Sequence, residues 1–239
     1  MKRMKWYDVA LQIVLAVMLT VLFLSSSVFF TLAFRPLYYI DMQLLSVRID
    51  ASNWGVELTD AQIKENYDAL IDYNLPLSDG YLSFPSLDMS DDGRQHFAEV
   101  KDIFDAFKVA AIVSLPLSVV GIVYFRKEKN KFYLPLTTGL CVGLPLLGGG
   151  LIALNWDRVF VTFHEIFFDN DKWIFNPYTD PVITILPDEF FMHCAIMILS
   201  LVVLEGVGCL VAFFILRKGA AKKAKKENET PPEPEKSEA

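Results

Sequence analysis

Residues 132–156, FYLPLTTGLCVGLPLLGGGLIALNW, carry no charged side chain over 25 positions. At about 1.5 Å per residue, a helix of this length crosses a hydrocarbon core of about 30 Å with room for tilt. Shortly afterwards residues 159–175, VFVTFHEIFFDNDKWIF, place a histidine and a glutamate, His164 and Glu165, among phenylalanines. The chain therefore leaves the membrane and at once presents polar groups, either to anchor an interfacial segment or to act on a lipid.

Three more stretches are long and apolar enough to span a membrane. Residues 9–34 contain no charge, residues 109–125 form a shorter apolar run, and residues 190–216 are interrupted only by Glu205. With 53 % hydrophobic residues, the composition is also that of a membrane protein. The sequence predicts an all-α integral membrane protein with four transmembrane helices, at residues 9–34, 109–125, 132–156 and 190–216. The short second span would end at two snorkelling cations, Lys108 and Arg126.

Basic residues predict the orientation of the spans. They cluster in residues 1–8, in the tight loop 126–131 and directly after residue 216. The positive-inside rule then places both termini in the cytoplasm, with an uncleaved first span. The outer segments, 35–108 and 157–189, hold 21 of the 29 acidic residues and 8 of the 22 basic ones. A basic inner rim suits anionic membrane lipid, so nucleic acid is not an expected partner.

The segment 35–108 is long enough to form a small, mainly helical extracytoplasmic cap. Thr59 and Gln62 have the spacing of a capping box. A second helix is expected to begin near Ser90 or Asp91 and to run without a break into the second span. Residues 157–189 are expected to be an extracytoplasmic or interfacial segment. The charged, proline-bearing residues 217–239 are predicted to be a disordered cytoplasmic tail.

The chain has three histidines, two of which occupy mirrored positions. His96 lies shortly before the second span and His164 shortly after the third, about 18 and 12 Å from the spans in continuous helix. Each has a carboxylate nearby, Glu99 three residues on and Glu165 adjacent, and a carboxylate can orient an imidazole for general acid–base work. The alternative is that the histidines, like the tryptophans and tyrosines near them, only anchor the interface.

Two further ionisable residues occur in the fourth apolar run. Glu205, near its middle, either has a function or forms a hydrogen bond to a neighbouring helix, while His193 lies at its outer start. The cysteines all fall within spans and offer neither a disulfide framework nor a metal-ligand spacing. No nucleophile elbow, zinc-type His-Glu-x-x-His or phosphate loop occurs, so a metalloprotease is disfavoured.

Two stretches, GRQHFAEVKDIF at 93–104 and FHEIFFDNDKWIFNPYTDPVITILPDEFF at 163–191, resemble the bacterial lipoprotein intramolecular transacylases (Lit). The resemblance implies an acyltransferase of the bacterial cell membrane whose substrate is a diacylated lipoprotein. Such enzymes move the sn-2 acyl chain of the diacylglyceryl-cysteine to its α-amino group, which gives an N-acyl lyso-lipoprotein without a cofactor. The resemblance implies His96 and His164 as the catalytic pair at the outer leaflet. The resemblance does not itself assign the further candidates that could orient the substrate, which are Glu99, Glu165, Arg94, Tyr81, Trp173 and Asp180. The reaction that it implies needs neither a metal nor a cofactor.

Two other functions stay open at this point. The chain could be a non-enzymatic membrane protein whose acidic cap binds a partner or senses the state of the envelope. It could also be an acyltransferase of related chemistry that takes its acyl chain from a phospholipid. Loss of activity without the histidines would separate the first alternative from an enzyme, and consumption of added phospholipid would identify the second.

Overall fold

The computed structural model describes residues 5–77, 80–128 and 130–229, with side chains as far as Lys222. Every regular element in this part of the chain is a helix, so the predicted all-α class is confirmed. In chain order the helices are α1 (Trp6–Ala33), α2 (Pro36–Leu44), α3 (Val47–Asn53), α4 (Asp60–Asn74), α5 (Asp91–Phe125), α6 (Tyr133–Leu154), α7 (Trp156–Phe167), the 3-10 helix η1 (Pro181–Ile185) and α8 (Asp188–Glu229).

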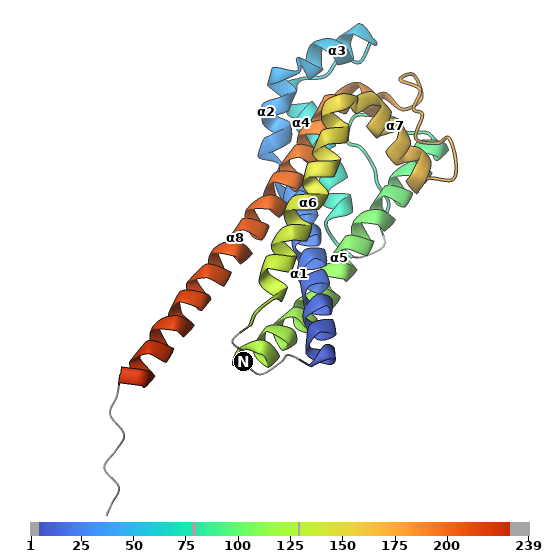
Figure 1. Cartoon of the computed structure of the whole chain (residues 1–239). Coiled ribbons are helices and arrows are strands. Elements are labelled where there is room, and N and C mark those ends of the chain that lie inside the picture. The colour runs from blue at the N-terminus through green and yellow to red at the C-terminus, as the bar shows by residue number, and fades with distance from the viewer. Residues whose placement is uncertain (1–4, 78–79, 129, 230–239) are drawn as a thin grey trace, which may run out of the picture.

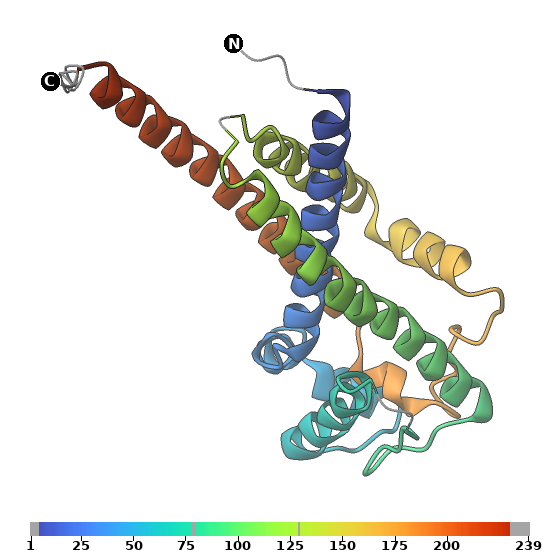
Figure 2. The same cartoon turned by 90° about the horizontal axis from the view of Figure 1, so that it is seen from below.

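Four of these helices, α1, α5, α6 and α8, are long and apolar enough to cross a membrane. α5 packs along α1 and α6 packs along α8, while α1 also contacts α6 and α8. The short helices gather at the end of this bundle that lies away from the N-terminus, and α8 diverges from the other long helices toward its C-terminal end (Figures 1 and 2). The chain is thus a four-helix membrane bundle with a helical cap at one end.

α5 is one continuous helix, as predicted, and it joins the cap to the bundle. Its N-cap is Ser90, whose hydroxyl oxygen accepts a hydrogen bond from the Gly93 backbone N–H at 3.0 Å. Residues 91–108 carry eight charged side chains, so only residues 109–125 are apolar enough to lie in hydrocarbon. The first half of α5 therefore continues the second span beyond its apolar part.

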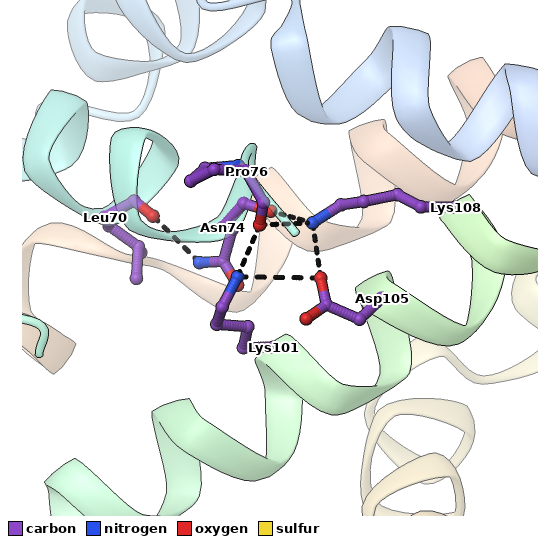
Figure 3. A network of polar contacts seen from close by, with 6 residues as sticks. All are labelled: Leu70, Asn74, Pro76, Lys101, Asp105 and Lys108. Carbon is purple, nitrogen blue, oxygen red and sulfur yellow. Dashed lines mark hydrogen bonds and ion pairs between the residues drawn. The ribbon is translucent and has the colours of Figure 1, made fainter. Parts of the chain in front are cut away.

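Two lysines of α5 bind the end of α4 (Figure 3). The Lys108 ammonium donates to the Asn74 carbonyl oxygen at 2.5 Å and to the Asp105 carboxylate at 2.5 Å, and the Lys101 ammonium donates to the Pro76 carbonyl oxygen at 2.6 Å. The predicted snorkelling of Lys108 is wrong, because its residue is only 8 % exposed. Both cations instead occupy the C-terminal end of α4, where the free carbonyl groups and the helix dipole favour positive charge.

The cap has an apolar core of its own, centred on two stacked tyrosines. The rings of Tyr38 (α2) and Tyr67 (α4) lie 3.8 Å apart, and the Tyr38 hydroxyl donates to the Ile185 carbonyl oxygen of η1 at 2.7 Å. Phe97 of α5 and Phe190 of α8 belong to the same buried cluster. The start of α5 is therefore packed into the cap as well as connected to the bundle.

The chain breaks between α6 and α7 at Asn155. This residue has an extended backbone (φ −167°, ψ 98°), and its side-chain oxygen caps α7 by accepting from the Arg158 N–H at 2.9 Å. α7 consequently turns away from the direction of α6 (Figures 1 and 2). The offset of about 12 Å between the third span and His164, which held only for a continuous helix, therefore does not apply.

Local sequence rules gave mixed results at the helix ends. The capping box of Thr59 and Gln62 is present, with the threonine backbone N–H donating to the glutamine side chain at 2.9 Å. The disordered tail that we predicted from residue 217 is wrong for its first part, because α8 continues to Glu229. Alanine, lysine and glutamate dominate residues 217–229, and all three are strong helix formers. The rest of the predicted tail, residues 230–239, lies outside the described residues.

Candidate active site

A buried carboxylate fixes the first turn of α5, on which one of the histidines lies. Asp180 is 3 % exposed, and its two oxygens accept from the Ser90 N–H and the Thr179 hydroxyl, each at 2.8 Å. A Cβ on Gly93 would lie 2.2 Å from the Asp180 Oδ1, so this close approach requires glycine. His96 comes one turn later and takes its position from this contact.

The imidazole of His96 is enclosed by aromatic rings. Ring centroids of Phe168, Phe175 and Phe97 lie 4.7, 5.3 and 5.8 Å from it, and the residue is 5 % exposed. Its Nδ1 is buried and has no hydrogen-bond partner among the described residues. Burial, with a smaller contribution from His164, lowers the pKa of His96 to about 4. This imidazole is therefore neutral at physiological pH and has an unmet hydrogen-bonding capacity.

His164 lies in the last turn of α7 and is held by its own helix. Its Nδ1 is 2.7 Å from the Phe160 carbonyl oxygen. Because a carbonyl oxygen only accepts, we infer that Nδ1 carries the proton and that Nε2 has the free lone pair. The Trp173 ring stacks on the imidazole at 4.7 Å, with the planes 30° apart. Burial lowers the pKa of His164 by more than the Phe160 bond raises it, which keeps the imidazole neutral near pH 7.

The structure brings the two predicted histidines together. Their ring centroids are 5.9 Å apart, and the Phe168 ring contacts both, at 4.7 Å from His96 and 5.5 Å from His164. Charge on one ring disfavours charge on the other at this distance. The arrangement can accept a proton at one nitrogen and donate a hydrogen bond from the other ring. Among the described residues no group of three histidine, cysteine or acidic side chains is placed to hold a metal ion.

The family model of the lipoprotein intramolecular transacylase Lit matches residues 13–191, a range that includes both histidines and the rings around them. The chain belongs to the Lit family. It is accordingly an acyltransferase of lipoprotein modification, and the resemblance read from the two sequence stretches is confirmed.

Solved structures agree with this assignment. The membrane integral Lit of Bacillus cereus is 32 % identical over 90 % of this chain and 98 % of its own, with a TM-score of 0.86. Two further structures of that protein, in which one histidine is replaced by arginine or by alanine, give TM-scores of 0.81 and 0.80 at the same 32 % identity. They cover 91 and 90 % of this chain and 95 and 96 % of their own. A comparison with curated proteins finds no match.

Glu99 of this Lit family member does not bond to His96, although the spacing of three residues suggested that it would. Its carboxylate accepts instead from the Asn170 side-chain amide at 3.2 and 3.1 Å and from the Gln95 amide at 3.0 Å. Burial raises the pKa of Glu99, but these two hydrogen bonds together with the nearby His96 and Lys172 bring it below its ordinary value. The carboxylate thus connects two chain segments rather than orienting an imidazole directly.

Glu165 and Trp173 have different relations to His164. Successive helical residues point in different directions, so Glu165 lies exposed on the polar side of α7 while His164 faces the bundle. Trp173 is stacked on the imidazole. A shallow hollow with three acidic side chains adjoins the histidine pair at this place, lined by Glu165, Phe168, Asp169, Asn170, Asp171 and Trp173.

Two of the predicted supporting residues lie away from the pair. The Arg94 side chain is exposed, with its Nε 3.9 Å from the Asp91 carboxylate. Tyr81 is fully exposed and borders a different hollow, beside the end of α4. In the part of the chain that the structure describes, neither makes a hydrogen bond to a histidine. Asp180 is a third case, because it acts on the α5 terminus that carries His96.

The remaining ionisable candidates are bound to neighbouring helices. His193 Nδ1 of α8 is 2.9 Å from the buried carboxylate of Asp41 on α2. The Glu205 carboxylate accepts from the Ser26 and Ser27 hydroxyls of α1 at 3.2 and 3.1 Å. These contacts match the interhelical alternative that the sequence left open for Glu205.

Sequence reasoning singled out neither the rings of Phe168 and Phe175 nor the amide of Asn170. All three lie in the stretch 163–191 that carries the family resemblance. A polar, uncharged asparagine between two aspartates was the available signal, since an amide in an acidic turn can donate where its neighbours cannot.

Proposed function

We propose that this Lit family member moves the sn-2 acyl chain of a diacylglyceryl-cysteine to the α-amino group of the same cysteine, with His164 as the proton acceptor. One observation carries the proposal. The Phe160 carbonyl oxygen, 2.7 Å from Nδ1, holds the proton of the neutral imidazole on that nitrogen, which leaves the Nε2 lone pair free beside the buried His96. A general base needs this combination of fixed tautomer and neutral charge.

The reaction requires only proton movement and orientation. The neutral α-amine attacks the sn-2 carbonyl carbon, an N–C bond forms, and the amine proton passes to His164 Nε2. A neutral N–H of His96 donates to the oxyanion that develops on the former carbonyl oxygen. The bond from that carbon to the sn-2 oxygen then breaks, and the His164 imidazolium returns the proton to the departing oxygen. Both nucleophile and ester belong to one substrate, so no co-reactant is consumed.

The burial of His96 supports its role as a neutral donor rather than as an imidazolium acid. With its pKa at about 4, this imidazole does not carry a second proton at pH 7. A cation on His96 would also oppose formation of the His164 imidazolium at a ring distance of 5.9 Å. The unpartnered His96 Nδ1 gives the substrate a polar atom to bind in an otherwise aromatic enclosure.

We also propose that the pair acts at the outer leaflet of the bacterial cell membrane, with both termini cytoplasmic. On α7 the exposed apolar side chains of Phe163, Ile166 and Phe167 are separated from the polar Asp157, Arg158 and Glu165. A short helix with such segregated faces lies in the headgroup region. The ester of a membrane-anchored lipoprotein substrate lies at that depth, and membrane lipid surrounds the site.

The test uses a purified diacylated lipoprotein incubated with the wild type, with His164→Asn and with His193→Asn. The asparagine side-chain NH₂ occupies the position of the imidazole Nδ1. At residue 164 it therefore keeps a donor to the Phe160 carbonyl oxygen but removes the basic Nε2. At 193 it keeps the donor to Asp41 and serves as the matched control. Tandem mass spectrometry reads the position of the acyl chain, because intramolecular transfer leaves the intact mass unchanged.

We expect N-terminally acylated fragments from the wild type and from His193→Asn, and a loss of about 10²–10⁴-fold for His164→Asn. Normal turnover by His164→Asn would refute the role of this histidine. Isotope-labelled phospholipid added to the same reaction identifies the acyl donor, since label in the product would show intermolecular transfer. A wild type that leaves the substrate diacylated would refute the proposed reaction.

A further inference from the structure

We propose that Asn170 is a positioning residue that sets the spacing of the two histidines through its hydrogen bonds to Glu99. This inference rests on the proposed function of the histidine pair. It concerns a residue that touches neither imidazole, and it assigns to the Asn170–Glu99 bridge the task of holding α7 against α5.

α7 packs less deeply than the long helices, so a polar bridge can affect its position. None of its residues is buried, and Asn155 interrupts the helix directly before it. Several of its hydrophobic side chains, Phe163 and Phe167 among them, are exposed, and its packing comes from half-buried residues such as Phe160, whose ring lies 5.8 Å from that of Phe191 in α8. Half-buried side chains give a modest packing energy, which leaves a part for the loop that comes after the helix.

Both the oxygen and the NH₂ group of the Asn170 side chain form hydrogen bonds, so the amide has one favoured orientation. Its Oδ1 accepts from the Lys172 backbone N–H at 2.9 Å, which turns the NH₂ group toward Glu99. That group lies 3.2 and 3.1 Å from the two carboxylate oxygens, and Gln95 donates to the same carboxylate at 3.0 Å. Hydrogen bonds to an ionised acceptor are the stronger kind, so this small network is a firm contact.

The bridge closes a ring of contacts around the reacting groups. Glu99 is one helical turn after His96 on α5, and Asn170 comes shortly after α7 ends, two residues beyond the Phe168 that contacts both imidazoles. A second tie occurs along the same loop, because the Lys172 ammonium donates to Gln95 and lies 3.6 Å from the Asp92 carboxylate. Asn170 is therefore the polar tie nearest in sequence to His164.

The chemistry of the bridge predicts why an amide is required. An aspartate at position 170 has the same shape and still accepts from Lys172, but it would place one carboxylate about 3 Å from another and repel it. Asn170→Asp should move α7 away from α5 and lengthen the distance between the imidazoles. Misplacement of a catalytic group by about 1 Å can cost 10²-fold in rate.

The experiment compares Asn170→Asp, Glu99→Gln and the double variant in which both changes are combined. In the double variant the introduced glutamine donates to the introduced aspartate and still accepts from Gln95, so the bridge is rebuilt with reversed polarity. Asn176→Asp is the matched control, because it adds the same charge to the same loop at an exposed residue. The Asn176 side-chain oxygen accepts a hydrogen bond from the Tyr178 N–H at 3.0 Å, and an aspartate oxygen can accept it equally well.

We expect Asn170→Asp to lower kcat by about 10- to 100-fold with KM changed less than threefold. Glu99→Gln keeps one oxygen that can accept from Asn170, so its loss should be smaller, and the double variant should recover to within about threefold of wild type. Asn176→Asp should behave as wild type. A normal kcat in Asn170→Asp, or a double variant no better than Asn170→Asp, would overturn the positioning role.

A second readout is independent of activity. Hydrogen exchange of residues 156–167, monitored by mass spectrometry on protein in nanodiscs, should be faster in both single variants and normal in the double variant and in Asn176→Asp. If the wild type made no lyso-lipoprotein but this exchange pattern held, the proposed reaction would fail and the bridge would stand. Unchanged hydrogen exchange in every variant would refute the proposed role of the Asn170–Glu99 bridge.

Discussion

His96 and His164 lie 5.9 Å apart, yet they are supported in opposite ways. His96 is on a long continuous helix whose first turn is fixed by a buried aspartate and whose neighbour Phe97 belongs to the cap core. His164 is on a short helix without a buried residue, after a break at Asn155. His96 therefore lies on a rigidly packed helix, whereas the position of His164 depends more on the loop that follows α7.

The contrast agrees with the two roles proposed for the pair. A neutral, enclosed histidine on a rigid helix suits the proposed task of donating to a charge that develops at a fixed point. The proposed proton acceptor, His164, lies on the less deeply packed helix. Perturbing each support by itself tests whether the division is correct.

The largest effect is expected at the rigid support, from Gly93→Ala. Replacing a helical glycine by alanine usually stabilises by about 1 kcal/mol, but here the new methyl group would lie 2.2 Å from the Asp180 Oδ1. We expect a lower unfolding temperature and a loss of activity of about 10²-fold, because the α5 terminus and His96 must shift. Thermal unfolding and the transacylation assay measure both.

Gly80→Ala is the control for this substitution, since a Cβ at that position would meet nothing within 4 Å. A stabilised, fully active Gly93→Ala would show that Asp180 does not constrain the turn that carries His96.

The dependence of the reaction rate on pH should show the titration of only one of the two histidines. Because the pKa of His164 is lowered from 6.5, its basic form is complete above that pH and is lost as the pH falls, with about a tenfold loss of rate per unit below its pKa. The pKa of His96, at about 4, lies below the working range. Deprotonation of the substrate amine, near pH 8, adds a second rise with pH.

Initial rates of N-acylation between pH 5 and 9 would check the profile, with His164→Asn as the reference. A rate that falls as pH rises through about 6 to 7 would contradict the assignment, because it would require a histidine that acts as an imidazolium acid.

A smaller effect is expected at the support of His164, from Asn155→Ala. Loss of this N-cap should cost α7 about 0.5–2 kcal/mol, which corresponds to faster hydrogen exchange in residues 156–167 and a several-fold drop in kcat. Asn155→Asp retains the oxygen that accepts from the Arg158 N–H and should preserve both. Equal exchange in all three proteins would show that α7 is held without its cap.

The smallest effect is expected from Tyr81→Phe. The tyrosine is fully exposed beside the end of α4, so removal of its hydroxyl should change kcat/KM by less than about twofold. A larger loss, measured in the same assay, would return this residue to the group of supporting candidates and would mean that the substrate reaches the cap.

Sequence reasoning succeeded where a local pattern was sufficient. Long uncharged runs define the four spanning helices, and Ser90 with the carboxylates after it marks the start of α5. The histidine pair was found from its place at the ends of two spans. The break at Asn155 was missed because the flanking residues contain no proline or glycine, although asparagine is a common N-cap.

Contacts between distant residues were beyond the reach of local patterns. Glu99 was matched with His96 because the two are three residues apart, whereas its actual partner, Asn170, is 71 residues away. Likewise, the burial of Lys108 depends on the backbone carbonyl groups that end α4, 32 and 34 residues distant, and no side-chain pattern reveals those acceptors.

The two lysines that donate hydrogen bonds to the end of α4 connect the cap to the second span. Lys101 and Lys108 continue the same helix that forms the second span, so the cap cannot shift without that helix (Figure 3). A change in the tilt of this helix, such as a thicker or thinner bilayer imposes on a spanning helix, would therefore move the cap as well. His96, on the same helix, would move with it.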